Sequence, residues 1–136
     1  MPTLLLWVQE IYILQLFQIF WLRGFQDAIK QTKAKLIYVL NIMTKWGETN
    51  NFKASDFAKT LLLYVKKDKL DYIICNNSPI NKDLIEKYKE EKAEPVFIDK
   101  KELEKYANNI IEEDVSLQAE IVRHDAKKIA SVIMSI

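Results

Sequence analysis

The chain has 136 residues, enough for one domain, and its 20 Lys and Arg against 19 Asp and Glu give a net charge of +1. This balance removes the electrostatic basis for nucleic-acid binding or for a polybasic membrane surface. One cysteine and one histidine supply neither an intrachain disulfide nor a zinc ligand set, which fits a reducing cytoplasm. Neither of the two glycines lies in a phosphate-cradling loop, so we do not expect a complete nucleotide enzyme here.

The first 22 residues differ in composition from the rest of the chain. They contain no Lys or Arg, and their one acid is Glu10. Residues 4–22 are nineteen residues with fifteen apolar ones, which is just long enough for a membrane-spanning helix. Glu10 in mid-span costs about 2.5–3.5 kcal/mol on insertion scales, and a basic region and cleavage site typical of a signal peptide are missing. These features count against a membrane span or a signal peptide, so a membrane-anchored protein is only an alternative interpretation.

From residue 23 onward, short apolar runs alternate with amphipathic segments. The runs predict strands at residues 36–41, 70–76 and 95–99. The amphipathic segments predict the end of one helix at 25–34 and further helices at 55–66, 82–92, 100–107 and 125–135. This alternation indicates an α/β fold with a parallel, Rossmann-like sheet flanked by helices.

Candidate ligand contacts follow two of the predicted strands. Parallel sheets bind ligands beyond the carboxyl ends of their strands, and residues 41–49 and 76–79 are both placed there. The first segment carries Asn41, Thr44, Glu48 and Thr49, and the second carries Asn76 and Asn77. The second segment precedes Pro79, so a turn that caps the next helix is the alternative. The pattern favours recognition over a catalytic triad.

Other residues whose side chains could act in catalysis have simpler structural interpretations. His124 beside Asp125 could form a base held by a carboxylate, but no nucleophile is visible, and a capping or surface role is favoured. Cys75 ends an apolar strand and is expected to be an inert core thiol. Glu48 and Asp56 are expected to be solvated or capping acids. We therefore assign no catalytic residue, no metal site and no cofactor.

Several longer strings resemble a known family. NIMTKWGETNNFKASDF at 41–57 resembles the pattern N-x-M-T-Q-x-G-E-T-D-x-Y-x-A-S-D-H of the YvcK-type gluconeogenesis factors, relatives of the CofD 2-phospho-L-lactate transferases. NNSPI at 76–80, LIEKYKEEKAEPVFID at 84–99 and IVRHD at 121–125 follow in matching order. The resemblance covers residues 24–136. This chain departs from the pattern at Lys45, Trp46, Asn50 and Phe57.

The resemblance implies a cytoplasmic, Rossmann-like protein that binds UDP-sugars, supports growth on gluconeogenic carbon sources and maintains cell wall and cell shape. It places sugar-nucleotide contacts at Tyr88 and Arg123, with the loop at 41–49 lining the cleft. Because the family carries further nucleotide motifs upstream, we expect a C-terminal fragment that is inactive alone. A separately encoded N-terminal half and a second copy of the chain are the protein partners considered. A CofD-type transferase fragment is the enzyme alternative.

Residues 1–22 have a specific explanation under this resemblance. A permitted back-translation, read from its third nucleotide, gives A-D-I-I-I-M-G-P-G-N-L-Y-T-T-I-I-P-N-F-L-V, which resembles the family segment ADLIIxGPGSLYTSIIPNLLV. We therefore expect residues 1–22 to be an out-of-frame translation and residues 23–136 to be the C-terminal part of a larger domain. The predicted ligand-binding residues are Asn41, Thr44, Glu48, Thr49, Asn76, Asn77, Tyr88 and Arg123.

Overall fold

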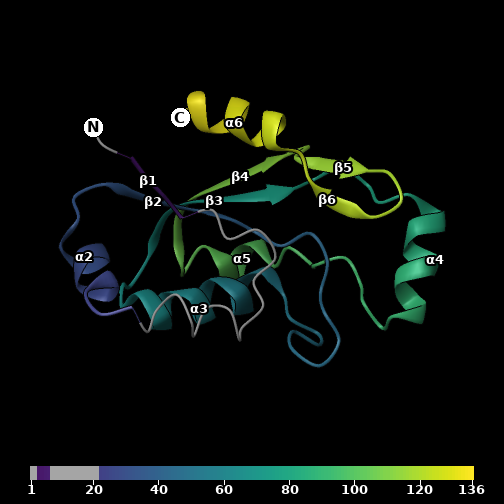
Figure 1. Ribbon diagram of the computed structural model, residues 1–136, viewed down its shortest axis with the longest axis horizontal. Coiled ribbons are helices and arrows are strands. Elements are labelled where there is room, and N and C mark those ends of the chain that lie inside the picture. Colours follow the sequence, from purple (N-terminus) through teal and green to yellow (C-terminus); the bar gives the residue numbers. More distant parts are fainter. Residues whose placement is uncertain (1–2, 7–21) are drawn as a thin grey trace.

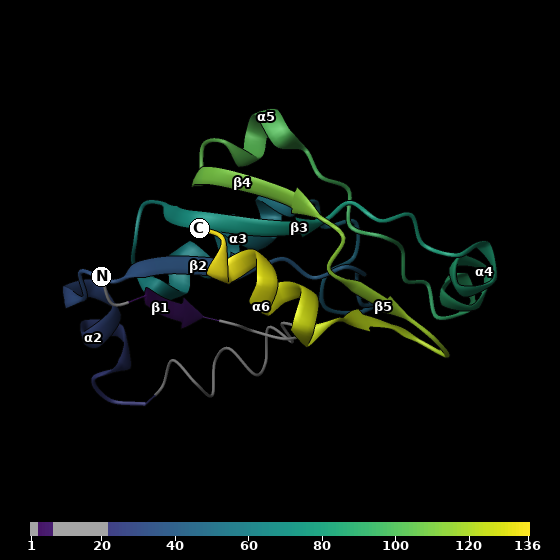
Figure 2. The same ribbon diagram turned by 90° about the horizontal axis from the view of Figure 1, so that it is seen from above.

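The structure, a computed structural model, describes residues 3–6 and 22–136 and is built on one parallel sheet (Figure 1). Its strands lie in the order β1 (Thr3–Leu6), β2 (Lys35–Val39), β3 (Leu70–Asn76) and β4 (Ala107–Glu113) (Figure 2). All three pairings are parallel. The carboxyl ends of the strands therefore meet at one edge of the sheet.

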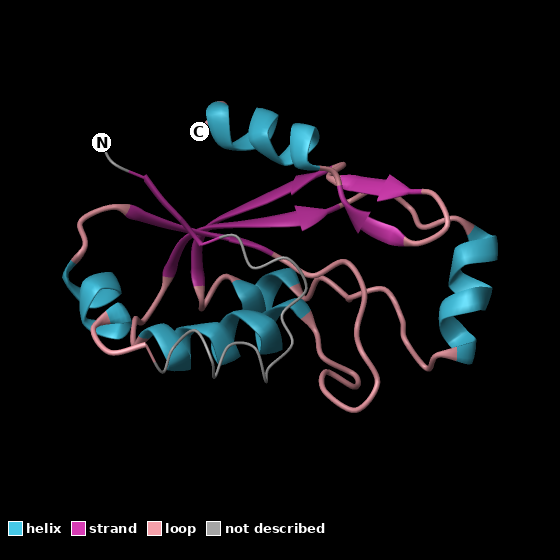
Figure 3. Cartoon of the chain, viewed as in Figure 1, coloured by secondary structure: helices cyan, strands magenta, loops and turns pink. Residues whose placement is uncertain are grey.

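Helices cover both faces of the sheet (Figure 3). Helices α3 (Ala54–Val65) and α5 (Lys100–Leu103) lie on one face, and α2 (Phe25–Gln31) packs beside α3. Helix α6 (Ala126–Met134) lies on the opposite face. Strands covered on both faces need apolar side chains pointing both ways, as the short apolar runs predict.

A further helix and a hairpin extend beyond the carboxyl ends of the strands (Figure 1). The helix is α4 (Lys82–Glu90), and the hairpin pairs β5 (Ser116–Gln118) with β6 (Val122–His124) in antiparallel fashion. The loop between β2 and α3 lies at the same end of the molecule. These three segments are the ones that can surround a ligand.

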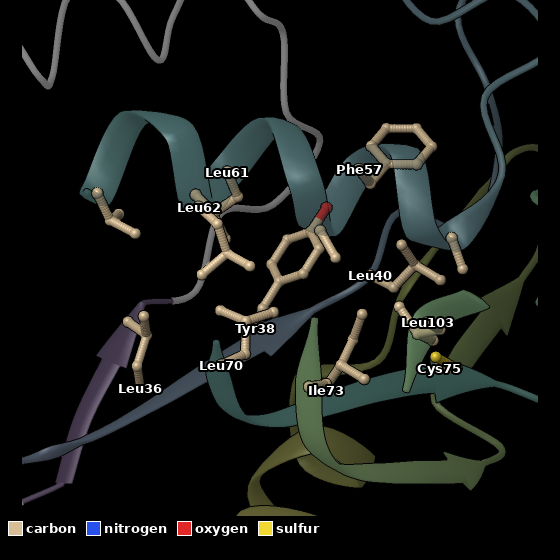
Figure 4. Close-up of a cluster of buried hydrophobic side chains, with 14 of the residues drawn as sticks. Leu36, Tyr38, Leu40, Phe57, Leu61, Leu62, Leu70, Ile73, Cys75 and Leu103 are labelled. Atoms are coloured by element: carbon tan, nitrogen blue, oxygen red, sulfur yellow. The ribbon is translucent and has the colours of Figure 1, made fainter. Parts of the chain in front are cut away.

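The core divides between the two faces of the sheet. Along β2, Leu36 and Tyr38 belong to the cluster packed against α3, whereas Ile37 and Val39 belong to the cluster under α6. This is the period-two alternation of a strand. The larger cluster is completed by side chains from α3, β3 and α5 (Figure 4): Phe57, Leu61, Leu62, Leu70, Ile73, Cys75 and Leu103.

The amino terminus of α3 is held by two carboxylates. The Asp56 carboxylate accepts a hydrogen bond from the Lys53 backbone N–H at 2.9 Å. Asp99, far along the chain, accepts from the Ser55 backbone N–H at 2.9 Å and from the Ser55 hydroxyl. Carboxylates here satisfy backbone donors that a helix leaves unpaired and complement its dipole. The contact from Asp99 also fixes the segment before α5 against α3.

Most predicted elements are confirmed. The exception is near residue 100, where the predicted strand is absent and a different segment forms the next strand of the sheet. The strands at 36–41 and 70–76 and the helices at 25–34, 55–66, 82–92 and 125–135 correspond to observed elements within a few residues. The strand predicted at 95–99 is wrong. That segment makes only isolated bridges, Met43 with Pro95 and Lys53 with Phe97, because it runs along the loop after β2 and not within the sheet.

The fourth strand of the sheet is β4, which the sequence does not predict. It begins at Ala107, where the helix predicted at 100–107 ends. Helix α5 is shorter than predicted and ends at Leu103. Strand β4 has the sequence ANNIIEE, and its four exposed residues are all polar, whereas its first residue, Ala107, is buried. An edge position in the described sheet explains this polarity, since one side of β4 pairs with β3 and the other has no strand beside it in the described residues.

The apolar amino-terminal segment is described only in part. Residues 4–6 lie in β1, where Leu4 pairs with Leu36 and Leu6 with Tyr38, so they do not begin a helix as the spanning interpretation requires. Residues 7–21 lie outside the described residues. In the part of the chain that is described, no helix combines the length and apolar character needed to cross a bilayer. The expectation that residues 1–22 are an out-of-frame translation, with the insertion or deletion near Leu22 and Arg23, stays a prediction.

Candidate ligand-binding site

A cleft of about 360 Å³ opens beyond the carboxyl end of β2. The loop after β2 forms one wall, the end of α4 forms the second, and β6 forms the third. The side chains that line it are both polar and aromatic: Asn41, Ile42, Met43, Thr44, Lys45, Trp46, Tyr88, Glu91, Ala93, Val122, Arg123 and His124. Four of the eight predicted ligand-binding residues, Asn41, Thr44, Tyr88 and Arg123, are thus brought together.

The wall formed by the loop is held by a neighbouring segment. Thr44 donates its backbone N–H to the Glu94 carbonyl at 2.8 Å, and the Glu94 N–H donates to the Thr44 hydroxyl oxygen at 3.0 Å. The Val96 N–H donates to the Ile42 carbonyl at 2.9 Å. The Thr44 oxygen is thus already an acceptor within the fold, while the hydroxyl proton can be donated into the cleft.

Asn41 connects the cleft to the core. It follows the end of β2, and its side-chain oxygen accepts a hydrogen bond from the Tyr38 hydroxyl at 3.2 Å. Burial raises the pKa of Tyr38 far above its usual range, so the phenol stays a neutral donor. The Asn41 amide is therefore oriented by a group in the hydrophobic core before any ligand arrives.

Glu48 and Thr49 brace a turn and are not among the side chains that line the cleft. The Thr49 hydroxyl oxygen, which is buried, accepts from the Lys45 backbone N–H at 2.8 Å. One carboxylate oxygen of Glu48 lies 3.4 Å from the Lys45 ammonium. The other is buried with no hydrogen-bond partner among the described residues. Their structural role is to shape the turn that carries Lys45 and Trp46.

Asn76 and Asn77 hold the segment after β3. Asn76 donates from its amide to the Ser78 carbonyl at 2.9 Å, and its amide oxygen accepts from the Val115 N–H at 3.2 Å. Asn77 donates to the Glu112 carbonyl at 3.0 Å. Asn76 lines a smaller neighbouring cavity of about 160 Å³, which it shares with Asn41. The contact from Asn76 to Ser78 fits the turn interpretation, whereas the predicted cap is wrong, because α4 begins after Asn81 without a side-chain cap. The other two contacts join this segment to β4 and to the residues that follow it.

Tyr88 joins two walls of the cleft. Its hydroxyl oxygen accepts a hydrogen bond from the Val122 backbone N–H at 3.0 Å, which ties α4 to the start of β6. The hairpin is tied to α4 again by Lys87, whose ammonium donates to the Glu120 carbonyl at 2.9 Å. The Tyr88 hydroxyl proton can still be donated to a ligand while its oxygen accepts from the backbone.

Arg123 is the exposed residue between two buried ones on β6. Val122 and His124 point inward on either side of it, as strand alternation requires. His124 places its Nε2 2.9 Å from the carbonyl oxygen of Leu40, which anchors β6 to the end of β2. The guanidinium of Arg123 thus stands on a fixed backbone at the cleft. A planar fork of donors in such a position suits a phosphate or carboxylate.

Residues considered for catalysis have structural roles. Asp125 caps α6, since its carboxylate accepts from the backbone N–H groups of Lys127 at 2.9 Å and Lys128 at 3.2 Å. Asp125 is therefore a helix cap. The capping or surface role predicted for His124 is wrong, because His124 is buried and its Nε2 contacts the Leu40 carbonyl oxygen. Burial raises the pKa of the Cys75 thiol to about 12, which confirms an inert core thiol. Among residues 3–6 and 22–136, no group of His, Cys, Asp and Glu side chains is arranged to hold a metal ion.

Glu91 and Ala93 line the cleft, although the sequence does not assign them to it. Trp46 belongs to the loop at 41–49 that the resemblance places at the cleft, but the sequence does not single it out as a ligand contact. Its exposure is what reveals it, because 55% of its surface is accessible. Glu91 and Ala93 follow α4, where Ala93 donates its N–H to the Tyr88 carbonyl at 2.9 Å. Nothing in the local sequence indicates where this helix end is placed.

A parallel sheet flanked by helices, with a cleft beyond its carboxyl edge, defines a Rossmann-like α/β protein with a candidate ligand site. The sequence model of the family described as 2-phospho-L-lactate transferase CofD matches residues 16–116. The chain therefore belongs to the CofD family. The Rossmann-like fold and the relation to gluconeogenesis factors that the sequence implied are both confirmed.

Known proteins resemble this chain in sequence and structure. A relative from Clostridium acetobutylicum is 38% identical over 109 residues, covering 79% of this chain and 24% of the relative. The gluconeogenesis factor of Halalkalibacterium halodurans is 34% identical over 112 residues, covering 82% and 35%. A UPF0052-family crystal structure from Bacillus halodurans has a TM-score of 0.76 at 32% identity, covering 82% and 36%. The chain thus spans about a quarter to a third of the curated relatives' length.

Proposed function

We propose that the cleft binds a UDP-sugar and that Arg123 contacts its diphosphate. In this proposal the chain is part of a gluconeogenesis factor that supports growth on gluconeogenic carbon and maintains cell wall and cell shape. The observation that carries the proposal is the position of Arg123, an exposed guanidinium held between two buried residues at the cleft. The relatives named gluconeogenesis factors support the role in growth on gluconeogenic carbon, and the role in cell wall and cell shape comes from the family resemblance alone.

The surroundings of Arg123 support a diphosphate ligand. Bidentate hydrogen bonds from a guanidinium to phosphate oxygens are among the strong, charge-assisted class. Tyr88 and Thr44 line the same cleft, and each can donate a hydroxyl proton while its oxygen accepts from a backbone N–H within the fold. A ligand with several oxygen acceptors therefore finds donors on three separate segments. Glu91 adds an acceptor at the rim, which suits the hydroxyl groups of a sugar.

A binding measurement on this chain tests the assignment, because all three cleft walls lie within it, whereas the activity of the whole protein is expected to need the upstream half. Calorimetric titration of the 136-residue chain with UDP-glucose, a representative UDP-sugar, is expected to show binding that Arg123→Ala weakens. A charge-assisted hydrogen bond contributes about 1.5–3 kcal/mol, so we expect roughly a 10- to 150-fold loss. Lys127→Ala, which removes a cation from α6 outside the cleft lining, is the matched control. Unchanged affinity in Arg123→Ala, or no binding by the unaltered chain, would reject the proposal.

The CofD-type transferase is the alternative, since the family description names a phospholactyl transfer enzyme. The gene restored to the family reading frame with its upstream half separates the two. Under our proposal the restored protein binds the sugar nucleotide, restores growth on a gluconeogenic carbon source in a strain lacking it, and transfers no phospholactyl group. Turnover with a deazaflavin acceptor would favour the enzyme instead.

A further inference from the structure

An exposed tryptophan stands at the rim of the cleft. Trp46 keeps 55% of its surface accessible, and its side chain lines the cleft together with Tyr88 and Arg123. A large aromatic ring gains stability by burial, so its exposure in a cleft needs an explanation beyond folding. Because Trp46 and Arg123 line the same cleft, a ligand in that cleft is the relevant partner.

The turn that carries Trp46 is braced on both sides of it. The Thr49 hydroxyl accepts from the Lys45 N–H at 2.8 Å, and the Thr49 N–H donates to the Lys45 carbonyl at 2.9 Å. Gly47 has a φ of 85° and donates its N–H to the Asn50 side chain at 2.6 Å. The left-handed backbone at Gly47 is favourable for glycine and strained for other residues. The indole is therefore presented by a preorganised backbone.

A lysine from another segment fixes the orientation of the ring. The Lys92 ammonium lies 4.6 Å from the centroid of the Trp46 ring, in a cation–π contact. Lys92 has a left-handed backbone with φ of 55° just after α4, and the Ala93 N–H beside it bonds to the Tyr88 carbonyl. Trp46 lines the cleft, whereas Lys92 is not among the lining residues. Lys92 thus lies over one face of the indole, while Trp46 remains one of the residues that line the cleft.

We propose that Trp46 is the stacking platform for the pyrimidine base of the nucleotide, which makes it a specificity-determining residue of the cleft. This inference rests on the proposed function, because it takes Arg123 as the diphosphate contact. A flat heteroaromatic base stacks on an indole face, as bases stack on aromatic side chains in single-strand binding proteins. The base rather than the sugar then lies on Trp46, and the sugar extends from Arg123 toward the other rim.

Three ligands separate the base from the sugar. The 136-residue chain is titrated with UDP-glucose, with UDP, which lacks the sugar, and with glucose 1-phosphate, which lacks the base. Trp46→Ala is expected to weaken UDP-glucose and UDP by the same factor, about tenfold for the loss of one stacking contact. It is expected to leave any affinity for glucose 1-phosphate unchanged. Trp46→Phe, which keeps a ring, is expected to retain most of the affinity.

Tryptophan fluorescence gives a second measurement of stacking beside the affinities. In a chain with Trp7→Phe and Trp21→Phe, Trp46 is the remaining tryptophan, and stacking of UDP is expected to quench its fluorescence. Loss of UDP-glucose affinity without loss of UDP affinity would overturn base stacking. Unchanged affinities in Trp46→Ala, with binding abolished in Arg123→Ala, would overturn this inference and leave the proposed function standing. Absence of binding by the unaltered chain would overturn both.

Discussion

The hydroxyl oxygen of Tyr88 accepts a hydrogen bond from the backbone N–H of Val122 at 3.0 Å, and this contact joins helix α4 to strand β6. Val122 is buried, so its N–H depends on this partner. The same contact sets the separation of two cleft walls, one of which carries Arg123. The Tyr88 side chain therefore both stabilises the fold and is a candidate ligand contact.

Tyr88→Phe is expected to destabilise the fold. Removing the hydroxyl leaves the Val122 N–H without its acceptor, at a cost of about 1–3 kcal/mol when the group is buried. The midpoint of urea unfolding measures this loss. Tyr72→Phe is the matched control, because it keeps the ring over which the Lys35 ammonium lies at 5.3 Å. Equal midpoints for Tyr88→Phe and the unaltered chain would contradict the role assigned to this hydroxyl.

Asp99 is expected to stabilise helix α3 although it lies 44 residues beyond Ser55. Asp99→Ala removes the acceptor of both the Ser55 N–H and the Ser55 hydroxyl. Loss of a helix cap costs about 0.5–2 kcal/mol, and urea unfolding followed by circular dichroism measures it. Asp99→Asn keeps an acceptor oxygen and should lose less. Full stability in Asp99→Ala would show that water replaces this cap without cost.

Stability is expected to fall at acidic pH partly through Asp114. Its hydrogen bond with the Lys128 ammonium, at 2.6 Å, lowers the pKa of this carboxyl below its usual range. Because the folded pKa is depressed, the stabilisation is present above the unfolded pKa and is lost as pH falls through the folded pKa. Both side chains are substantially exposed, so the contribution is below about 1 kcal/mol.

Urea unfolding of Asp114→Asn from neutral to acidic pH measures this contribution. The variant should be less stable than the unaltered chain at neutral pH, and the two should converge as Asp114 is protonated. A constant difference across the whole range would contradict the role of the charge.

Cys75 is expected to react with thiol reagents only when the chain unfolds. It is buried in the cluster between the sheet and α3, and burial raises the pKa of its thiol to about 12. The reactive thiolate is therefore scarce at neutral pH. Labelling with a disulfide reagent across a urea series should follow the unfolding transition. Rapid labelling of the folded chain would contradict the packing around β3.

The sequence predicts this fold best where burial is two-sided. Strand β2 (KLIYV) and strand β3 (LDYIICN) read as apolar runs because helices cover both of their faces. Strand β4 (ANNIIEE) does not follow this pattern, because it lies at the edge of the sheet and its exposed residues are polar. Residues 95–99 mimic a buried strand, although their apolar side chains pack from outside the sheet along the loop after β2.

Four of the eight predicted ligand-binding residues line the cleft, and the difference between these four and the others again depends on tertiary contacts. Asn41 and Thr44 follow β2 directly, so their place at the cleft can be derived from strand polarity. Tyr88 and Arg123 enter through the family resemblance and lie on segments that only tertiary contacts bring together. Asn76 and Asn77 also follow a strand, but their amides bond to nearby backbone groups. Local polarity alone does not distinguish a ligand contact from a turn contact.

The expected frameshift in residues 1–22 predicts a specific result at the DNA level. Sequencing across the codons for Phe20 to Phe25 and upstream should reveal an insertion or deletion that separates this frame from a glycine-rich upstream half. Strand β1 is compatible with either frame, because the family frame places I-I-I where Leu4, Leu5 and Leu6 stand. A continuous frame without an upstream half would contradict the frameshift.

Ligand mapping by NMR tests the central claim most directly. A nitrogen-15-labelled 136-residue chain is titrated with UDP-glucose, and backbone shift changes are assigned to residues. If the cleft binds the sugar nucleotide, the largest changes fall on its three walls, at Thr44 and Trp46, at Tyr88, and at Arg123. Changes confined to other parts of the chain, or no changes at all, would contradict binding in the cleft.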